Sequence, residues 1–291
     1  MLTDMDDHQY RLGNMVVSRS GYGAMQLSGD GVFGQAGDRD EAIAVLRTAI
    51  ETGVDHIDTA QYYGPGVVTE LIRPALDPYP EGLALVSKFA ARRDETGAVL
   101  PYDEPHELRH GIEDNLRTLG VEQLAAVNLR VMDNATPDGR FFDQLGAMVA
   151  AQDDGLIAGI GLSNISHEHL VDALEVTEIV CVQNSFSLAE RKSLPLLREC
   201  DERGIAFVPF STLGWPRSQH DDILTNSVVT SVARHHGATA AQVALAWLLA
   251  LAPNVLLIPG TSSRTHLREN LAASALSLEQ DEIIRLTDQF Q

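Results

Sequence analysis

The chain has 291 residues, of which 44% are hydrophobic, and a formal net charge of −20 from 41 acidic and 21 basic residues. This length and composition allow a sizeable buried core, arranged as one large α/β domain or two smaller ones. The excess of negative charge argues against binding to a phosphate backbone, so we expect no nucleic-acid partner.

No segment reads as a secretory signal, and no apolar run approaches the roughly 18 residues of a membrane span. We therefore expect no membrane association and a cytoplasmic protein. The two cysteines, Cys181 and Cys200, lie in apolar or helical surroundings without the spacing of metal ligands. Buried, reduced thiols are the expected state of both.

The first predicted element is a β-hairpin over residues 11–18, because Gly13 and Asn14 lie between apolar runs. Beyond it, short runs rich in β-branched residues alternate with longer amphipathic stretches. The expected strands cover residues 21–25, 54–58, 83–88, 125–130, 156–161, 179–183, 205–210 and 254–260. The expected helices cover residues 40–53, 69–77, 105–120, 143–155, 168–176, 194–204 and 240–251.

This alternation continues without a linker or a shift in composition, which favours one closed parallel barrel over two domains. We predict an α/β fold, a single (β/α)8 TIM barrel spanning residues 1–291, with the N-terminal β-hairpin plugging the barrel floor. A doubly wound sheet is the alternative that the periodicity leaves open.

Three polar residues lie at or just after the ends of two neighbouring strands. In TIM-barrel enzymes this end of the barrel carries the active site. Asp58 ends the strand 54–58, Tyr63 lies in the loop after it, and Lys88 ends the next strand. A cation beside a phenol lowers the pKa of the phenol, and a carboxylate beside the lysine keeps that cation charged. The trio predicts a phenol suited to general acid catalysis.

Several segments in this order resemble those of the aldo-keto reductase superfamily. GVDHIDTAQYYG is similar to the family's signature around its catalytic Asp and Tyr, and LVSKF to the segment around its Lys. GIGLSN, VQNSFS and IPGTSS are similar to its cofactor-binding segments. The resemblance implies a (β/α)8 barrel that binds NADP(H) and moves hydride between nicotinamide and the carbonyl carbon of a small molecule. It places Asp58, Tyr63 and Lys88 at catalytic positions, with Tyr63 as the proton donor.

The same resemblance implies a set of cofactor-binding residues. Ser163, Asn164 and Gln183 end strands, where their hydroxyl and amide groups would orient the nicotinamide carboxamide, and Phe210 matches the aromatic on which the ring stacks. The other positions carried over are Gly23, Ala24, Met25, Ser211, Thr212, Leu213, Gly260, Thr261, Ser262, Ser263, His266, Glu269 and Asn270. We expect no metal ligand among these residues.

The segment after the last strand opens a helix, and a helix N-terminus with nearby hydroxyl groups suits a phosphate. Family members often carry Lys and Arg there against the 2′-phosphate, whereas this chain has Gly260 and His266 at the matching positions. Arg264 and Arg268 lie close by. We therefore expect a preference for NADPH over NADH that is smaller than a Lys and Arg pair would give.

The fourth catalytic position of the family is usually a His, and this chain has Arg130 there, with Asn128 on the same face of the strand. An Arg at this position resembles the branch of bacterial aldo-keto reductases that includes pyridoxal reductases. In this interpretation Arg130 contacts the carbonyl oxygen or an anionic group of the substrate. Alternatively it pairs with an acid such as Asp133 and only shapes the pocket.

Three other functions stay open at the level of sequence. One is a barrel that binds NADP(H) for regulation or redox sensing and turns over slowly, and a second is a Schiff-base aldolase that uses Lys88. A metallohydrolase is the third, although no H-x-H or HExxH pattern appears among the ten histidines. The substrate loops are expected at residues 26–37, parts of 89–103, and 215–222; the oligomeric state is unknown.

Overall fold

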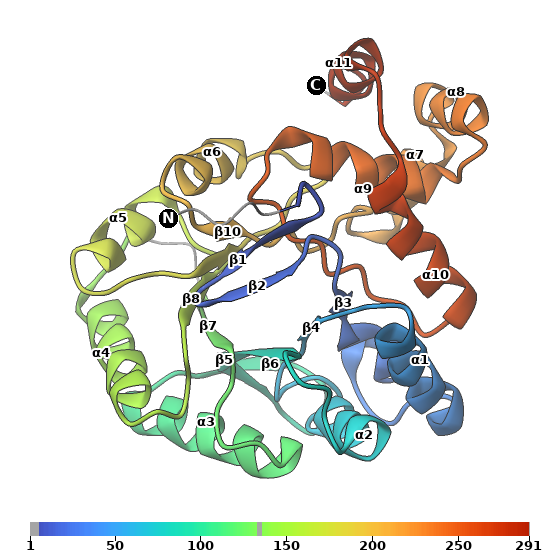
Figure 1. Cartoon of the computed structure of the whole chain (residues 1–291). Helices are drawn as coiled ribbons and strands as arrows, with labels where there is room; N and C mark the ends of the chain where they lie inside the picture. Colours follow the sequence, from blue (N-terminus) through green and yellow to red (C-terminus); the bar gives the residue numbers. More distant parts are fainter. Residues whose placement is uncertain (1–5, 133–135, 291) are drawn as a thin grey trace.

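The computed structural model describes residues 6–132 and 136–290. Its centre is a parallel sheet curled into a barrel, with the strands in the order β10-β9-β8-β7-β5-β4-β3 (Figure 1). The strands are β3 (Tyr22–Gly23), β4 (His56–Asp58), β5 (Ala84–Arg93), β7 (Ala126–Arg130), β8 (Ile160–Ser163), β9 (Cys181–Gln183) and β10 (Ala206–Phe207). The predicted (β/α)8 architecture is confirmed, and the doubly wound alternative is wrong.

The segment 254–260 closes the ring between the first and last of these strands. It pairs with both neighbours through isolated parallel bridges, Phe207 to Val255 on one side, and Ser20 to Leu257 and Gly23 to Gly260 on the other. The expected eighth strand therefore occupies its position in the barrel without forming a regular ladder. Pro259 within it has no backbone N–H to donate, which limits such a ladder.

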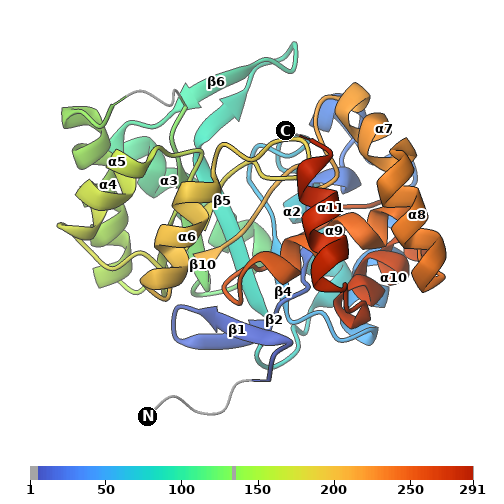
Figure 2. The same cartoon turned by 90° about the horizontal axis from the view of Figure 1, so that it is seen from above.

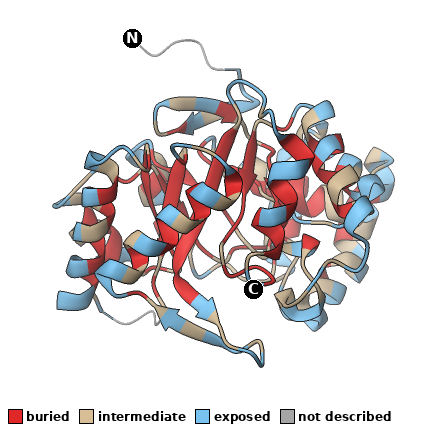
Figure 3. Cartoon of the chain, turned by 90° about the horizontal axis from the view of Figure 1, so that it is seen from below, coloured by how far each residue is buried: buried red, intermediate tan, exposed pale blue. Residues whose placement is uncertain are grey.

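A ring of helices surrounds the barrel, and their inner faces are buried while their outer faces meet solvent (Figure 3). The helices that the sequence predicts are α1 (Arg39–Glu51), α2 (Val67–Leu76), α3 (Pro105–Leu119), α4 (Gly139–Asp153), α5 (His167–Leu174), α6 (Leu194–Glu202), α9 (Ala240–Leu251) and α10 (Arg264–Ala272). Short 3₁₀ helices cover Ala24–Leu27, Asp30–Val32 and Ala273–Ala275. None of the helices in the described ranges is long and apolar enough to cross a membrane.

Three helices were not predicted from the sequence: α7 (Arg217–Thr225), α8 (Ser227–His236) and α11 (Gln280–Asp288). Ile223 is the buried residue of α7. α8 buries Val229, Val232 and Ala233, and α11 packs Ile283 and Leu286 on the core, so these helices carry short apolar stripes that the sequence prediction missed. The cysteine prediction holds, because Cys181 and Cys200 are both free and buried. Burial raises the pKa of each thiol to about 12.

The predicted hairpin is present as β1 (Gln9–Leu12) and β2 (Met15–Ser18), which lie across one end of the barrel (Figures 1 and 2). Leu12 and Val17 pack into an apolar cluster with residues of the barrel strands. The backbone N–H of Ser18 donates to both carboxylate oxygens of Asp55, at 3.0 and 2.8 Å. Apolar packing and these hydrogen bonds together close the barrel floor.

The opposite end carries a second hairpin, formed by β5 and β6 (Val99–Tyr102), which projects beyond the barrel (Figure 2). The sequence prediction ended the strand at Lys88, whereas β5 continues to Arg93 because residues 90–93 pair antiparallel with β6. Part of the expected substrate loop 89–103 is therefore regular structure. Its turn reaches Phe33, since a side chain at Gly97 would meet the Phe33 ring at 3.1 Å.

Candidate active site

Parallel register brings the polar strand ends to the end of the barrel opposite the floor. Asp58 pairs with Gly23, Arg130 pairs with Ser163, and Ser163 pairs in turn with Gln183. Residues far apart in the sequence thus lie at one level of the barrel, because neighbouring parallel strands end together.

The centre of this layer is a buried ion pair. The Lys88 ammonium lies 2.5 Å from Oδ1 of Asp58, and both side chains are 5% exposed. Lys88 also donates to the carbonyl of Thr59 at 3.0 Å, and Gln183 Nε2 donates to Oδ2 of Asp58 at 2.8 Å. An ammonium has three donors, and these two acceptors use two of those of Lys88.

Tyr63 lies beside this pair, with its ring centroid 4.9 Å from the Lys88 ammonium. It is 6% exposed and contacts Tyr62 edge to face. Burial raises the pKa of the Tyr63 phenol well above its usual range, and the charge of Asp58 adds to this, while Arg130 and Arg93 oppose it. The sequence prediction of a lowered pKa is therefore wrong for this structure. Loss of water around the phenolate outweighs the nearby cations.

Two guanidinium groups act on the Tyr63 phenol from the rim of the barrel. Arg93 donates to the backbone carbonyls of Tyr62, at 3.2 Å, and Gly97, at 2.7 Å. The Nε of the half-buried Arg130 is itself buried, without a hydrogen-bond partner among the described residues. Asp133, the acid considered above as its partner, lies outside those residues. Within the described chain neither guanidinium pairs with a carboxylate.

A cleft of about 190 Å³ opens beside Asp58 and Tyr63. The predicted residues that line it are Gly23, Met25, Asp58, Tyr63, Gln183, Phe210, Ser211, Thr212, Leu213 and Gly260. Those that do not line it are Ala24, Lys88, Arg130, Ser163, Asn164, Thr261, Ser262, Ser263, His266, Glu269 and Asn270. Of these, Ala24, Lys88, Ser163 and Asn270 are buried.

The cleft has further walls that were not among the predicted site residues. They are Gln26, Pro209, Gly214, Trp215, His220, Ile258 and Pro259. Trp215 is 72% exposed although it is a large aromatic. The loop 215–222 had been singled out as variable, and an aromatic residue directly after Gly214 was the signal within it.

The three residues predicted to orient a carboxamide differ in whether their polar side-chain atoms already have hydrogen-bond partners. Asn164 Nδ2 donates to the carbonyl of Val131 at 2.8 Å, and the Gln183 amide is bound to Asp58. Oγ of Ser163 is buried and has no hydrogen-bond partner among the described residues. A buried hydroxyl without a partner costs free energy, which a ligand atom placed against it would recover.

The predicted phosphate segment begins α10. Ser263 caps the helix by accepting the backbone N–H of His266 at 3.4 Å, and the His266 side chain is exposed. Arg264 turns toward α1 instead, where its Nε and Nη2 lie 3.1 and 3.0 Å from the two carboxylate oxygens of Glu41. Its charge is therefore already paired, whereas Arg268 is exposed with no such partner in the described chain.

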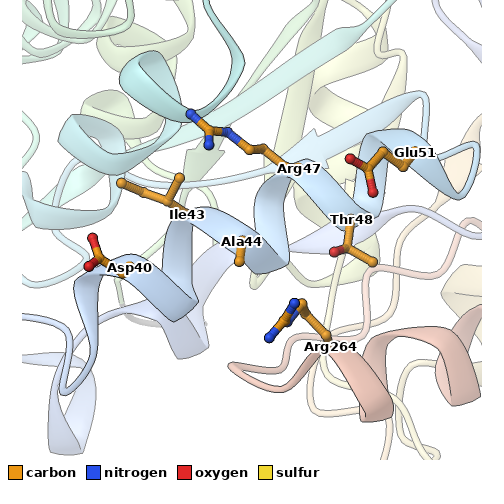
Figure 4. Close-up of a pocket in the computed structure, with 7 residues that line it drawn as sticks. All are labelled: Asp40, Ile43, Ala44, Arg47, Thr48, Glu51 and Arg264. Carbon is orange, nitrogen blue, oxygen red and sulfur yellow. The ribbon is translucent and has the colours of Figure 1, made fainter.

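A second and wider cavity, of about 480 Å³, lies along α1 near the start of α10 (Figure 4). Its walls are Asp40, Ile43, Ala44, Arg47, Thr48, Glu51 and Arg264. Figure 4 shows their side chains around α1, with charges of both signs and none of the strand-end residues. The strand-end cleft combines burial, an ion pair and a perturbed phenol, so we assign the candidate active site to it.

The fold and this cleft define the class of the protein: a (β/α)8 barrel with its polar site at the carboxyl ends of the strands, as in barrel enzymes. The model for the aldo/keto reductase family matches residues 20–289. The chain belongs to the aldo/keto reductase family.

Known proteins are similar to this chain along nearly its whole length. The chain is 46% identical over 280 residues to pyridoxine 4-dehydrogenase of Escherichia coli K12, covering 95% of this chain and 96% of that protein. It is 33% identical to an uncharacterized oxidoreductase of Schizosaccharomyces pombe, covering 96% and 89%. The structure of an aldo/keto reductase from Klebsiella pneumoniae in complex with NADP and acetate matches with a TM-score of 0.81 and 25% identity, covering 97% of this chain and 95% of that chain.

Proposed function

We propose that this protein is an NADP(H)-dependent reductase that converts an aldehyde or ketone to an alcohol, with pyridoxal as the substrate. The observation that carries the proposal is the buried Asp58–Lys88 pair beside the Tyr63 phenol in a strand-end cleft. The 46% identity to a pyridoxine 4-dehydrogenase supports the substrate. The whole chain acts as one barrel domain in this proposal, and we place it in the cytoplasm.

The residues present fit an NADP(H) cofactor. Ser163 offers a buried hydroxyl without a protein partner, Phe210 offers an aromatic face on the cleft, and α10 offers a helix N-terminus. Gly23 leaves no room for a larger residue, since a Cβ there would meet the carbonyl of Ile258 at 2.4 Å. The cleft volume suits one ring better than a whole dinucleotide, so the rest of the cofactor would extend beyond the cleft.

When bound, the cofactor supplies the hydride that adds to the carbonyl carbon. Tyr63 holds the proton that goes to the carbonyl oxygen, and its raised pKa keeps that proton in place at neutral pH. The Lys88 ammonium, 4.9 Å from the ring centroid of Tyr63, would stabilise the phenolate that Tyr63 becomes. Asp58 orients Lys88, and Gln183 and Thr59 fix both partners of the pair.

The two guanidinium groups indicate which carbonyl compounds fit. Arg93 and Arg130 add positive charge near Tyr63 without a carboxylate partner in the described chain. An anionic or phenolate-bearing aldehyde would supply the missing negative charge, and a guanidinium stays protonated throughout the working pH range. Pyridoxal, which carries a phenol beside its aldehyde, has this chemistry.

The Schiff-base alternative is disfavoured by the same geometry. A lysine that attacks a carbonyl needs a neutral amine with a free lone pair. The Lys88 nitrogen is instead held by the Asp58 carboxylate, at 2.5 Å, and by the Thr59 carbonyl, at 3.0 Å, so it is engaged as a donor within the protein.

Cofactor preference can be measured by titrating NADPH and NADH against the fluorescence of the protein. We expect NADPH to bind about tenfold tighter or less, since one charge-assisted hydrogen bond contributes about 1.5 kcal/mol and Arg264 is already paired with Glu41. The variant Glu41→Gln should release Arg264 and widen the preference, while the affinity for NADH stays unchanged. Equal or tighter binding of NADH would contradict the proposal.

Replacement of the proton donor should stop catalysis without affecting cofactor binding. We expect Tyr63→Phe to lower turnover about 10² to 10⁴-fold, the usual effect of losing a general acid, and to leave the NADPH affinity near that of the parent. Tyr62→Phe is the matched control, because Tyr62 is equally buried and contacts Tyr63, and it should keep its turnover. Retained turnover in Tyr63→Phe would mean that another group provides the proton.

The substrate itself can be tested by following NADPH oxidation with a panel of aldehydes. We expect pyridoxal and other small aromatic aldehydes to be reduced faster than sugars or steroids. A protein that binds NADP(H) for sensing would turn over slowly on the whole panel. If pyridoxal at millimolar concentration gives no oxidation above background, the pyridoxal assignment is lost, although other carbonyl substrates stay possible.

Arg130 should act on the substrate through its charge. We expect Arg130→Met to lower turnover about 10² to 10³-fold, as the loss of one oxyanion donor does in other enzymes. Arg130→Lys, which keeps the charge without the planar fork, should lie between the parent and Arg130→Met. Turnover of Arg130→Met within about threefold of the parent, with an unchanged pH profile, would instead assign Arg130 a structural role.

A further inference from the structure

Two helices that lie side by side far along the chain bring together two imidazoles and a carboxylate (Figures 1 and 2). α8 ends with His235 and His236, and Glu282 lies in the first turn of α11. His235 Nδ1 is 2.9 Å from Oε1 of Glu282, and His236 Nε2 is 2.8 Å from Oε2. The carboxylate thus lies between the two rings.

The carboxylate is buried and held in place by its own helix. Glu282 is 2% exposed, and its Oε2 accepts the backbone N–H of Glu279 at 3.0 Å. Farther along α11, the indole N–H of Trp247 donates to Thr287 Oγ1 at 3.0 Å. Arg191 also donates to the carbonyl of Thr287, so α11 is anchored to the barrel on two sides. One ligand group is therefore positioned in advance, which favours metal binding.

We propose that His235, His236 and Glu282 form a binding site for one divalent transition-metal ion, with Zn²⁺ as its occupant. Imidazole nitrogen and carboxylate oxygen are both ligands of Zn²⁺. The same set is a poor one for Mg²⁺ and Ca²⁺, which prefer oxygen ligands alone. Among the described residues, these three form a group of histidine and acidic side chains that could hold one ion.

The distances permit this with a small side-chain movement. Bonds of about 2.1 Å to one ion place two ligand atoms about 3.0 Å apart at a right angle and about 3.4 Å apart in a tetrahedron. The two nitrogen–oxygen separations, 2.9 and 2.8 Å, are already near this range. The ligand atoms all lie within 4.8 Å of one another, so a movement of one ring toward the other brings them to one ion. The His235 side chain is 69% exposed and has room to do so.

Three protein ligands leave the fourth position of a tetrahedral ion to water. Water can reach this position because the His235 side chain is exposed. The ion would link α8 to the C-terminal helix and so replace two hydrogen bonds by coordination bonds. The sequence had indicated no metal site, because adjacent histidines and a glutamate 46 residues beyond His236 follow no recognised ligand spacing. Ordinary ion pairs between the two helices are the competing explanation.

Titration calorimetry with Zn²⁺ on the chain without a histidine tag separates the two explanations. We expect one Zn²⁺ per chain, with no binding of Mg²⁺ in the same range. His235→Ala removes a ligand at an exposed position where folding is least disturbed, and it should weaken Zn²⁺ binding about tenfold or more. Glu282→Gln should weaken it as well.

The matched control is His167→Ala, because His167 faces a single carboxylate, Glu199, at 3.7 Å. That variant should bind Zn²⁺ like the parent. The proposal fails if the parent binds no Zn²⁺, if His235→Ala binds it as tightly as the parent does, or if His167→Ala loses as much affinity as His235→Ala. Any of these results would assign the cluster to ion pairing between α8 and α11.

Discussion

The buried pair of Lys88 and Asp58 is the interaction on which the strand-end site depends. Removing two charges from water costs several kcal/mol for each ion, so such a pair persists only where further hydrogen bonds satisfy it. Thr59 and Gln183 provide those bonds, and they come from the loop after β4 and from β9. The pair therefore requires the register of the barrel, and it brings the Lys88 ammonium to within 4.9 Å of the Tyr63 ring centroid. Fold and chemistry constrain each other at this one point.

The sequence was sufficient for the barrel and for the set of strand-end residues, because both follow from local patterns. Alternating apolar runs predict strands and helices, and the last residues of parallel strands meet at one edge. The pKa of Tyr63 could not be predicted in the same way, since its direction depends on how completely the fold removes water from the phenol. The pairing of Arg264 with Glu41 joins residues 223 positions apart and leaves no local signal. Helices α7, α8 and α11 were missed because they have only 9, 10 and 9 residues, so their apolar stripes give a weak periodic signal. The β5–β6 hairpin was missed because the residues of β6 are exposed or half-buried.

The distribution of charge is more informative here than its sum. The chain carries a net charge of −20, yet the guanidinium groups of Arg93 and Arg130 lie near Tyr63 without a carboxylate partner in the described residues. Arg264, which the sequence suggested as a phosphate ligand, is instead neutralised by an acid of α1. A cationic site on an acidic protein attracts anionic ligands locally, and their overall approach is opposed by the remaining surface charge.

The hairpin of β1 and β2 has a consequence for how the two ends of the barrel are used. The barrel interior is filled by side chains, and Leu12 and Val17 of the hairpin cover the apolar end of that filling. The cleft beside Trp215 lies at the opposite end. The two ends of one barrel thus have separate tasks, since residues at the floor stabilise the fold and residues at the strand ends form the polar site.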